Sequence, residues 1–243
     1  MSHQNAINLT DEELDKPIYR IMPVSRVKEI LQNKQLTLVK PHKWDDPFEN
    51  ALLASAFSMV DGTRVTFAAK DSVYGQCWTL HRETDAMWRI YSHNKDGVRV
   101  TSTPRKLLEA LSRTDPLHAV RAFIGKVSYQ SQKNLLARLG RINLLDTSGI
   151  GVAESLLHKR NEFRHEAEVR LVYCGPDGEC PNVVYQIPID SNALFDKMLF
   201  DPRTDSGQYK TDRADLKKLG YRGAIDKSGL YKPPSGLLFT LDR

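Results

Sequence analysis

The stretch Arg164-His165-Glu166-Ala167-Glu168-Val169-Arg170-Leu171-Val172-Tyr173 decides the fold class. From Glu166 onward its side chains alternate between charged and apolar with a period of two, which is typical of a β-strand that buries one face. The alternation predicts a strand over Glu166–Cys174, with the charged side chains on one face and the apolar ones in the core. The turn sequence Gly175-Pro176-Asp177-Gly178 then predicts a hairpin whose second strand is Val183–Ile189.

Short strand candidates recur along the rest of the chain, rich in β-branched and aromatic residues. Helical patterns lie between them irregularly, without the strict alternation that a parallel sheet would require. This order predicts an α+β fold with a mainly antiparallel sheet and inserted helices. The other strand candidates are Ile18–Met22, Leu36–Val39, Tyr74–Leu80, Gly97–Ser102, part of Val120–Tyr129, and Lys197–Phe200.

Length and composition are those of one globular unit. The chain has 243 residues, of which 40% are hydrophobic and 27% are charged, enough to bury a sizeable core. We predict a flexible N-terminal segment over residues 1–15 and a single α+β domain over residues 16–243. The first segment has no basic region followed by an apolar stretch, so it does not resemble a secretory signal. No run approaches the roughly 20 apolar residues that span a bilayer, so we expect no membrane contact and a cytoplasmic location.

The charge balance favours an anionic partner. The net charge is +5 and the pI is near 9.0, which is compatible with a nucleic acid or a phosphate-bearing cofactor. The basic and acidic residues are interspersed, however, so a mixed solvated surface is the simpler interpretation.

Three cysteines cannot all pair with one another. Cys174 and Cys180 flank the predicted turn and could form a hairpin disulfide or half of a metal site, whereas Cys77 is remote in sequence. Because no second Cys/His pair stands at ligand spacing, a reduced compartment without structural zinc is the expectation.

The charged face of the predicted strand is the candidate catalytic element. Two carboxylates at positions i and i+2 of a strand lie about 6–7 Å apart, so Glu168 could act on a substrate while Glu166 orients it. Arg170 could hold Glu168 ionised or bind a phosphate. The alternative is an exposed strand face with an ion pair of little energetic value.

Further polar and aromatic residues could join these carboxylates. Tyr19-Arg20 lies on the first predicted strand, and Thr101-Ser102-Thr103 ends a middle strand. Trp88 and Tyr91 stand three residues apart on a predicted helix, where core packing is the simpler interpretation and a cofactor platform the functional one. The segment Asp45-Asp46-Pro47-Phe48-Glu49 could bind a divalent cation, but it also fits a helix cap at Asp46 with Pro47 in the first turn.

Taken together, these motifs resemble the bacterial domain-of-unknown-function family 2971 (DUF2971). The resemblance spans most of residues 18–172 and implies no activity by itself. It is carried by Tyr19-Arg20, Trp44-Asp45-Asp46-Pro47-Phe48-Glu49, Met87-Trp88-Arg89-Ile90-Tyr91-Ser92, Gly97-Val98-Arg99-Val100, Lys159-Arg160 with Phe163, and His165-Glu166-Ala167-Glu168-Val169-Arg170.

The same order of motifs more distantly resembles the ADP-ribosyltransferases, whose sheet is split. This resemblance implies that Arg20 binds the phosphates of NAD, that Ser102 supports the nicotinamide ribose and that Glu168 stabilises a cationic transition state. Glu166 would then orient the target. The triplet Thr101-Ser102-Thr103 departs from the Ser-Thr-Ser of that family, and Thr103 also fits a helix N-cap.

The sequence thus predicts an NAD-dependent ADP-ribosyltransferase-like enzyme that acts on a protein or nucleic acid, as a toxin or defence protein. Glu168 and Glu166 are the predicted catalytic residues. A non-catalytic nucleic-acid-binding or accessory defence module is the alternative, and a metal-dependent nuclease using Asp46 and Glu49 is a weaker one. The oligomeric state is not indicated. The predicted cofactor-binding residues are Tyr19, Arg20, Trp88, Tyr91, Ser102 and Arg170.

Overall fold

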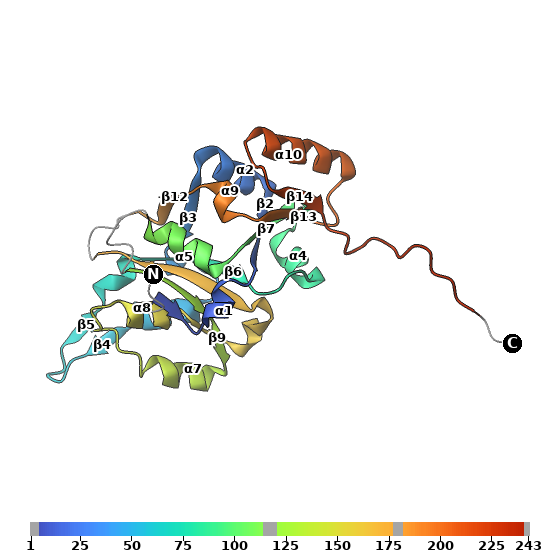
Figure 1. Ribbon diagram of the computed structural model, residues 1–243. Helices are drawn as coiled ribbons and strands as arrows, with labels where there is room; N and C mark the ends of the chain where they lie inside the picture. Colours follow the sequence, from blue (N-terminus) through green and yellow to red (C-terminus); the bar gives the residue numbers. More distant parts are fainter. Residues whose placement is uncertain (1–4, 114–120, 177–181, 241–243) are drawn as a thin grey trace.

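The computed structural model describes residues 5–113, 121–176 and 182–240 (Figure 1). Over these residues, one sheet of ten strands forms the centre of the molecule. Most of its neighbouring strands are antiparallel, so the predicted α+β class with a mainly antiparallel sheet is confirmed. The main path runs β1 (Ala6–Ile7), β8 (Ala122–Lys126), β11 (Glu168–Cys174), β6 (Val73–Thr79), β2 (Ile18–Pro23), β7 (Gly97–Ser102), β13 (Lys197–Phe200) and β14 (Ala224–Lys227).

Two more strands join the main sheet beside β6, and four short strands form two separate ribbons. In the main sheet, β12 (Val184–Pro188) pairs with β3 (Gln35–Val39), which in turn pairs with β6. In the ribbons, β9 (Ser128–Gln130) pairs with β10 (His158–Arg160), and β4 (Ala56–Ser58) with β5 (Arg64–Thr66).

Helices cover the sheet, and their first turns follow local sequence signals. Thr84 and Thr103 each accept a hydrogen bond from the backbone of the helix that follows, which fixes the starts of α4 and α5. No helix in the described part of the chain is both long and apolar enough to cross a bilayer. The helices are α1 (Asp11–Leu14), α2 (Val24–Asn33), α3 (Ala51–Ala54), α4 (Asp85–Tyr91), α5 (Pro104–Ser112), α7 (Gln132–Leu139), α8 (Ile150–Ser155), α9 (Ser191–Leu194) and α10 (Ser206–Lys218), with 3₁₀ turns η2 (Pro41–Lys43), η3 (Pro47–Asn50), η4 (Ala68–Asp71) and η5 (Asn161–Glu166).

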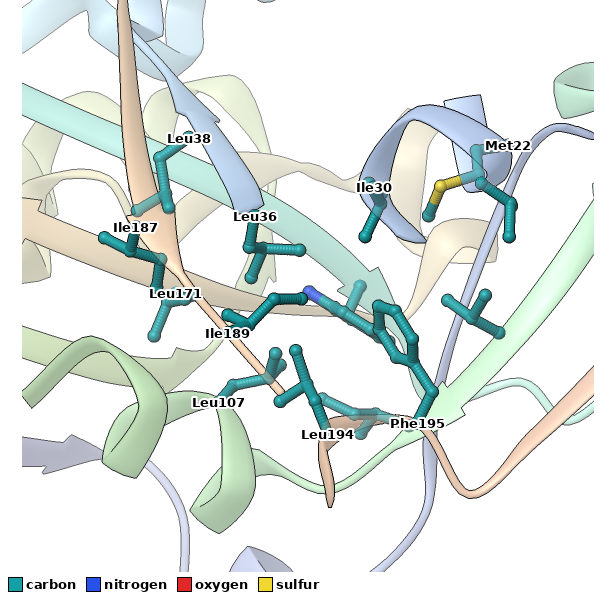
Figure 2. Packing of buried hydrophobic residues seen from close by; sticks show 14 of the residues in the cluster. Met22, Ile30, Leu36, Leu38, Leu107, Leu171, Ile187, Ile189, Leu194 and Phe195 are labelled. Atoms are coloured by element: carbon teal, nitrogen blue, oxygen red, sulfur yellow. The ribbon is translucent and has the colours of Figure 1, made fainter. Parts of the chain in front are cut away.

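The two sheet faces carry different cores. The larger core lies against α2, α5, α9 and α10, and Figure 2 shows Leu171 of β11 among Leu36, Ile187 and Leu107. A smaller core lies on the other face, under α3 and α8, and contains Val172. Successive β11 residues therefore alternate between two buried environments, which explains why this strand is buried along its whole length.

The sheet is split at β6. One edge of β6 pairs with β11 along seven residues, whereas its other edge pairs with β2 only at Tyr19↔Thr79 and with β3 only at Val39↔Gly75. Beyond the Tyr19↔Thr79 pair, β2 follows β7 and separates from β6. This separation creates the space in which the candidate site lies.

The predicted hairpin after β11 is wrong. The strand β12 forms close to the expected residues but pairs with β3 instead of β11. Both edges of β11 are already occupied, by β6 on one side and β8 on the other, so no edge remains for a hairpin partner. The predicted pair of Cys174 and Cys180 cannot be placed, because Cys180 lies outside the described residues.

The predicted flexible segment over residues 1–15 is also corrected. From residue 5 onward this segment forms β1, which pairs in parallel with β8, and α1, which buries Leu14 in the larger core. Thr10 caps α1 reciprocally with Glu13, so the short helix has a fixed start. Residues 1–4 lie outside the described part of the chain.

Candidate functional site

A cavity of about 130 Å³ opens where β2 separates from β6. Strands from the two halves of the sheet, the end of α4 and the turn η5 contribute its walls. Five of the eight predicted site residues meet here. The polar lining includes Tyr19, Arg20, Cys77, Thr79, Tyr91, Glu166 and Glu168.

Glu168, the first residue of β11, is held by two cations. Its Oε1 lies 2.8 Å from Lys159 Nζ, and its Oε2 accepts a hydrogen bond from Arg170 Nε at 2.6 Å. The backbone N–H of Glu168 donates to the hydroxyl of Tyr129 at 2.8 Å. Burial by itself would raise the pKa of the Glu168 carboxyl, but Arg170, a hydrogen bond from Glu166 and Lys159 together hold it below its ordinary value. Glu168 is therefore ionised at neutral pH.

Arg170 is fully buried, and each of its three nitrogens donates a hydrogen bond. Besides Glu168, its Nη2 donates to Glu49 Oε2 and its Nη1 to the carbonyl oxygen of Leu156, both at 2.6 Å. The guanidinium lies over the ring of Trp44, 4.5 Å from the centroid. Of the two roles predicted for Arg170, the structure supports holding Glu168 ionised, because the guanidinium is fully buried and does not line the cavity.

Lys159 joins three carboxylates and was not predicted as a site residue. Its Nζ lies 2.8 Å from Glu49 Oε1, 2.8 Å from Glu168 Oε1 and in contact with Glu166 Oε2. The side chain is 5% exposed. Burial would lower the pKa of Lys159, but the three carboxylates, with Glu168 the strongest, raise it well above its ordinary value. Lys159 is therefore a permanent cation at the back of the cavity.

Glu166 lies at the edge of this cluster, at the end of η5. It is not on β11 as predicted, because Ala167 adopts a left-handed conformation with φ of 44° and the chain turns there. The hydroxyl of Tyr91 donates to Glu166 Oε1 at 3.1 Å, and Lys159 contacts the other oxygen. Burial and the neighbouring Glu168 carboxylate raise the pKa of Glu166 to about 7. The two predicted carboxylates are thus adjacent, but Glu168 is ionised at neutral pH whereas Glu166 gains and loses its proton near pH 7.

Arg20 faces the same cavity from β2 and makes no ion pair with any described residue. Its Nη1 is buried and has no hydrogen-bond partner, and burial lowers the pKa of this guanidinium. Next to it, Tyr19 carries the guanidinium of Arg99 over its ring at 4.6 Å. A buried cation without a counter-charge is costly unless something anionic compensates it. The β2 wall is therefore suited to an anionic ligand.

Besides Arg170, two predicted cofactor-binding residues do not line the cavity. The hydroxyl of Ser102 is fully buried and donates to the carbonyl oxygen of Leu194 at 2.8 Å, which ties β7 to α9. Trp88 is also fully buried, and its Nε1 donates to Glu83 at 2.9 Å. Trp88 thus has the core-packing role that was its alternative interpretation, whereas no structural alternative was stated for Ser102.

The acidic side chains at the start of η3 contact cations behind the cavity. Asp46 caps η3 through the N–H of Phe48, as predicted, and also contacts Arg160 at 3.0 Å. Glu49 does not complete a capping box, because both its oxygens contact Lys159 and Arg170. Within the described residues, no group of three or more His, Cys, Asp or Glu is placed to hold a metal ion.

Three supporting residues escaped sequence reasoning. Lys159 was quoted only as part of the DUF2971 motifs, Glu49 was considered only in that motif and as a candidate metal ligand, and Tyr129 was not singled out. The signal available in the sequence was the pair of carboxylates at Glu166 and Glu168, since buried carboxylates need cations. Only the parallel register of β10 with β9, which places Lys159 beside Tyr129, identifies which cation is used.

Comparisons with known proteins give only distant similarities. No family model matches the sequence, and no curated protein matches it either, so the resemblance to DUF2971 stays a prediction. Among solved structures, the chain is similar to Thermus sp. 2.9 DarT in complex with NAD+, with 13% identity over 88% of this chain and 96% of that chain and a TM-score of 0.42. The same protein in complex with ADP-ribosylated ssDNA gives 14% identity, 88% and 94% coverage and a TM-score of 0.42. At these values of identity and TM-score, the similarity is too low to support a functional argument.

Proposed function

We propose that the protein is an NAD-dependent ADP-ribosyltransferase that modifies a macromolecule, either a protein or a nucleic acid. The observation that carries the proposal is the cavity shared by an ionised carboxylate, Glu168, and a guanidinium without an acidic partner, Arg20. DarT binds NAD+ in one of its solved structures, but its similarity to this chain is too distant to add weight. The proposal rests on the residues of the cavity.

The chemistry of NAD matches both walls. NAD supplies a glycosidic bond to a positively charged nicotinamide at one end and an anionic diphosphate further along. Arg20, with Tyr19 beside it, would bind the anionic part, and Glu168 would face the ribose. A cavity of about 130 Å³ has room for one ring system and not for a whole dinucleotide, so the rest of NAD would lie outside it.

The residues of the cavity can each perform one part of the transfer. As the bond from ribose to nicotinamide breaks, its electron pair leaves with the nicotinamide and positive charge develops on the ribose. The ionised Glu168 stabilises that charge. A nitrogen or oxygen of the target then bonds to the ribose carbon and loses a proton. Glu166, whose pKa of about 7 is suited to a general base near neutral pH, accepts that proton.

The test is the variant Glu168→Gln, which keeps the shape of the side chain and removes its charge. We expect NAD consumption to fall about 100-fold or more. The matched control is Asp212→Asn, another buried carboxylate that contacts a lysine, Lys28, but lies on α10 away from the cavity. It should keep wild-type turnover. Thermal unfolding of both variants checks that they fold.

Two results would contradict the proposal. Wild-type protein that consumes no NAD with either protein or nucleic-acid acceptors would remove the activity. Turnover by Glu168→Gln within tenfold of wild type would remove the assignment of Glu168. Binding of nucleic acid that weakens steeply with salt and ignores NAD, without turnover, would favour the non-catalytic module.

A further inference from the structure

The buried cluster behind the cavity contains more carboxylates than cations. Glu49 and Glu168 each contact both Lys159 and Arg170. Of the two cations, Glu166 contacts only Lys159, and its other oxygen accepts a hydrogen bond from the neutral hydroxyl of Tyr91. Two positive charges cannot compensate three negative ones. The arrangement therefore leaves Glu166 as the acid with the least compensation.

We propose that Lys159 is a positioning residue that holds Glu166 beside the ionised Glu168 and lets Glu166 release its proton near neutral pH, so that Glu166 can exchange a proton with the target. The use of that proton rests on the proposed transferase function. The difference in protonation between Glu166 and Glu168 does not depend on that function, because it follows from contacts within the free protein.

The charged and titratable groups that surround Glu166 are few. Lys159 approaches from β10, Glu168 from β11 and Tyr91 from α4. From β2, Arg20 lines the same cavity without contacting a carboxylate. From β6, Thr79 donates to the backbone oxygen of Glu166 at 2.5 Å and leaves the carboxylate untouched.

The remaining neighbours do not add a second cation. On η5 itself, Arg164 and His165 are exposed, and the ring of His165 meets the backbone of Glu162. Glu49 of η3 reaches Lys159 from the far side. Lys159 is thus the one described cation in contact with the Glu166 carboxyl.

This geometry gives Lys159 two opposing effects. It attracts the charge of Glu166 directly, and it also holds Glu168 and Glu166 close together, where two like charges disfavour each other. Without Lys159, Arg170 would still keep Glu168 ionised, because that contact is direct at 2.6 Å. Glu166 would then face the Glu168 charge without any cation and would keep its proton to a higher pH.

The experiment titrates carboxyl groups by ¹³C NMR in protein labelled at glutamate, without NAD. The Glu166 signal is assigned by its loss in Glu166→Gln. In wild type we expect it to titrate near pH 7. In Lys159→Met the midpoint should rise by about one pH unit or more. Lys159→Arg, which keeps the charge and serves if the methionine variant does not fold, should stay within about half a pH unit of wild type.

The matched control is Lys28→Met. Lys28 also bridges two carboxylates, Asp212 at 2.8 Å and Asp215 at 2.6 Å, but it joins α2 to α10 away from the cavity. This variant should leave the Glu166 midpoint unchanged. The inference is overturned if Glu166 titrates below pH 5 in wild type, if Lys159→Met leaves the midpoint in place, or if Lys28→Met moves it equally.

Turnover separates this inference from the proposed function. If the wild type consumes NAD, the rise of kcat/KM with pH should follow the Glu166 midpoint and move upward in Lys159→Met. If the wild type consumes no NAD while the NMR midpoints behave as expected, the transferase proposal fails and the role of Lys159 in allocating the proton stands. A pH profile that ignores both variants would contradict the use of the Glu166 proton in transfer.

Discussion

On the β11 side of the cavity, Arg170 and Lys159 contact three carboxylates, whereas on the β2 side Arg20 contacts none among the described residues. The first arrangement pairs each of its buried cations with carboxylates of the protein itself, which makes it part of the scaffold. The second leaves a buried donor without an acceptor, which costs stability that the folded chain does not recover. A site that pairs these two walls is built to keep one carboxylate fixed and to receive an anion opposite it.

The largest expected effect on stability comes from removing a cation on the β11 side of the cavity. Arg170→Met should lower the free energy of unfolding by about 3–5 kcal/mol, because it leaves the carboxylates of Glu49 and Glu168 with Lys159 as their only cation. Urea denaturation measures this loss. Arg105→Met is the matched surface control, since Arg105 is 38% exposed and pairs with Asp15. It should cost at most about 1 kcal/mol. Equal losses in the two variants would contradict the comparison.

The next effect is a dependence of stability on pH that originates at Glu166. Its pKa is about 7 in the folded protein and 4.5 ordinarily, so the folded state binds more protons between these values. This contribution is complete below about pH 4.5 and is lost as the pH rises through 7, on the order of 2 kcal/mol in total. Urea denaturation at pH 5, 6, 7 and 8 measures it. Glu166→Gln should remove this slope, and an unchanged slope would contradict the assignment.

The smallest effect on stability is expected on the β2 side of the cavity, at Arg20. Arg20→Met should leave the free energy of unfolding within about 1 kcal/mol of wild type or raise it, because a buried charge without a partner is removed. The same variant should raise the KM for NAD at least tenfold if Arg20 binds its phosphates. Ser102→Ala is the control from the original prediction. Its hydroxyl contacts Leu194 instead of the cavity, so its KM should not change.

A loss of several kcal/mol in Arg20→Met would show that Arg20 has a structural partner after all. A change of KM in Ser102→Ala, without a change in stability, would restore Ser102 to the cofactor site.

The strands were predictable because their pattern is local. β7 and β13 have the predicted bounds, and β2 and β6 differ from the prediction by one residue at their ends. Alternation and β-branched residues are enough to locate such segments. The pairing of β12 was not predictable in the same way, because the turn sequence after β11 favours a hairpin while the edges of β11 are taken by distant strands.

The candidate site was predictable in part for the same reason. Arg20, Tyr91, Glu166 and Glu168 belong to motifs whose chemistry can be read from residue type, and the cavity brings them together. Ser102 failed because a hydroxyl at a strand end looks identical whether it faces a ligand or a backbone carbonyl. Lys159 was missed because a buried lysine has no sequence signature; its importance lies in three contacts contributed by separate segments.

The single register pair between β2 and β6 has a mechanical consequence. The strands β2, β7, β13 and β14 form one half of the sheet, and β6, β11 and β8 belong to the other half. In the described sheet, Tyr19↔Thr79 is the only residue pair that joins β2 directly to β6. Rotation of one half of the sheet against the other about this pair would change the distance between Arg20 and Glu168 without disturbing the strand pairing inside either half. Thr79, whose hydroxyl also donates to the Glu166 backbone, connects this single pair to the acidic turn.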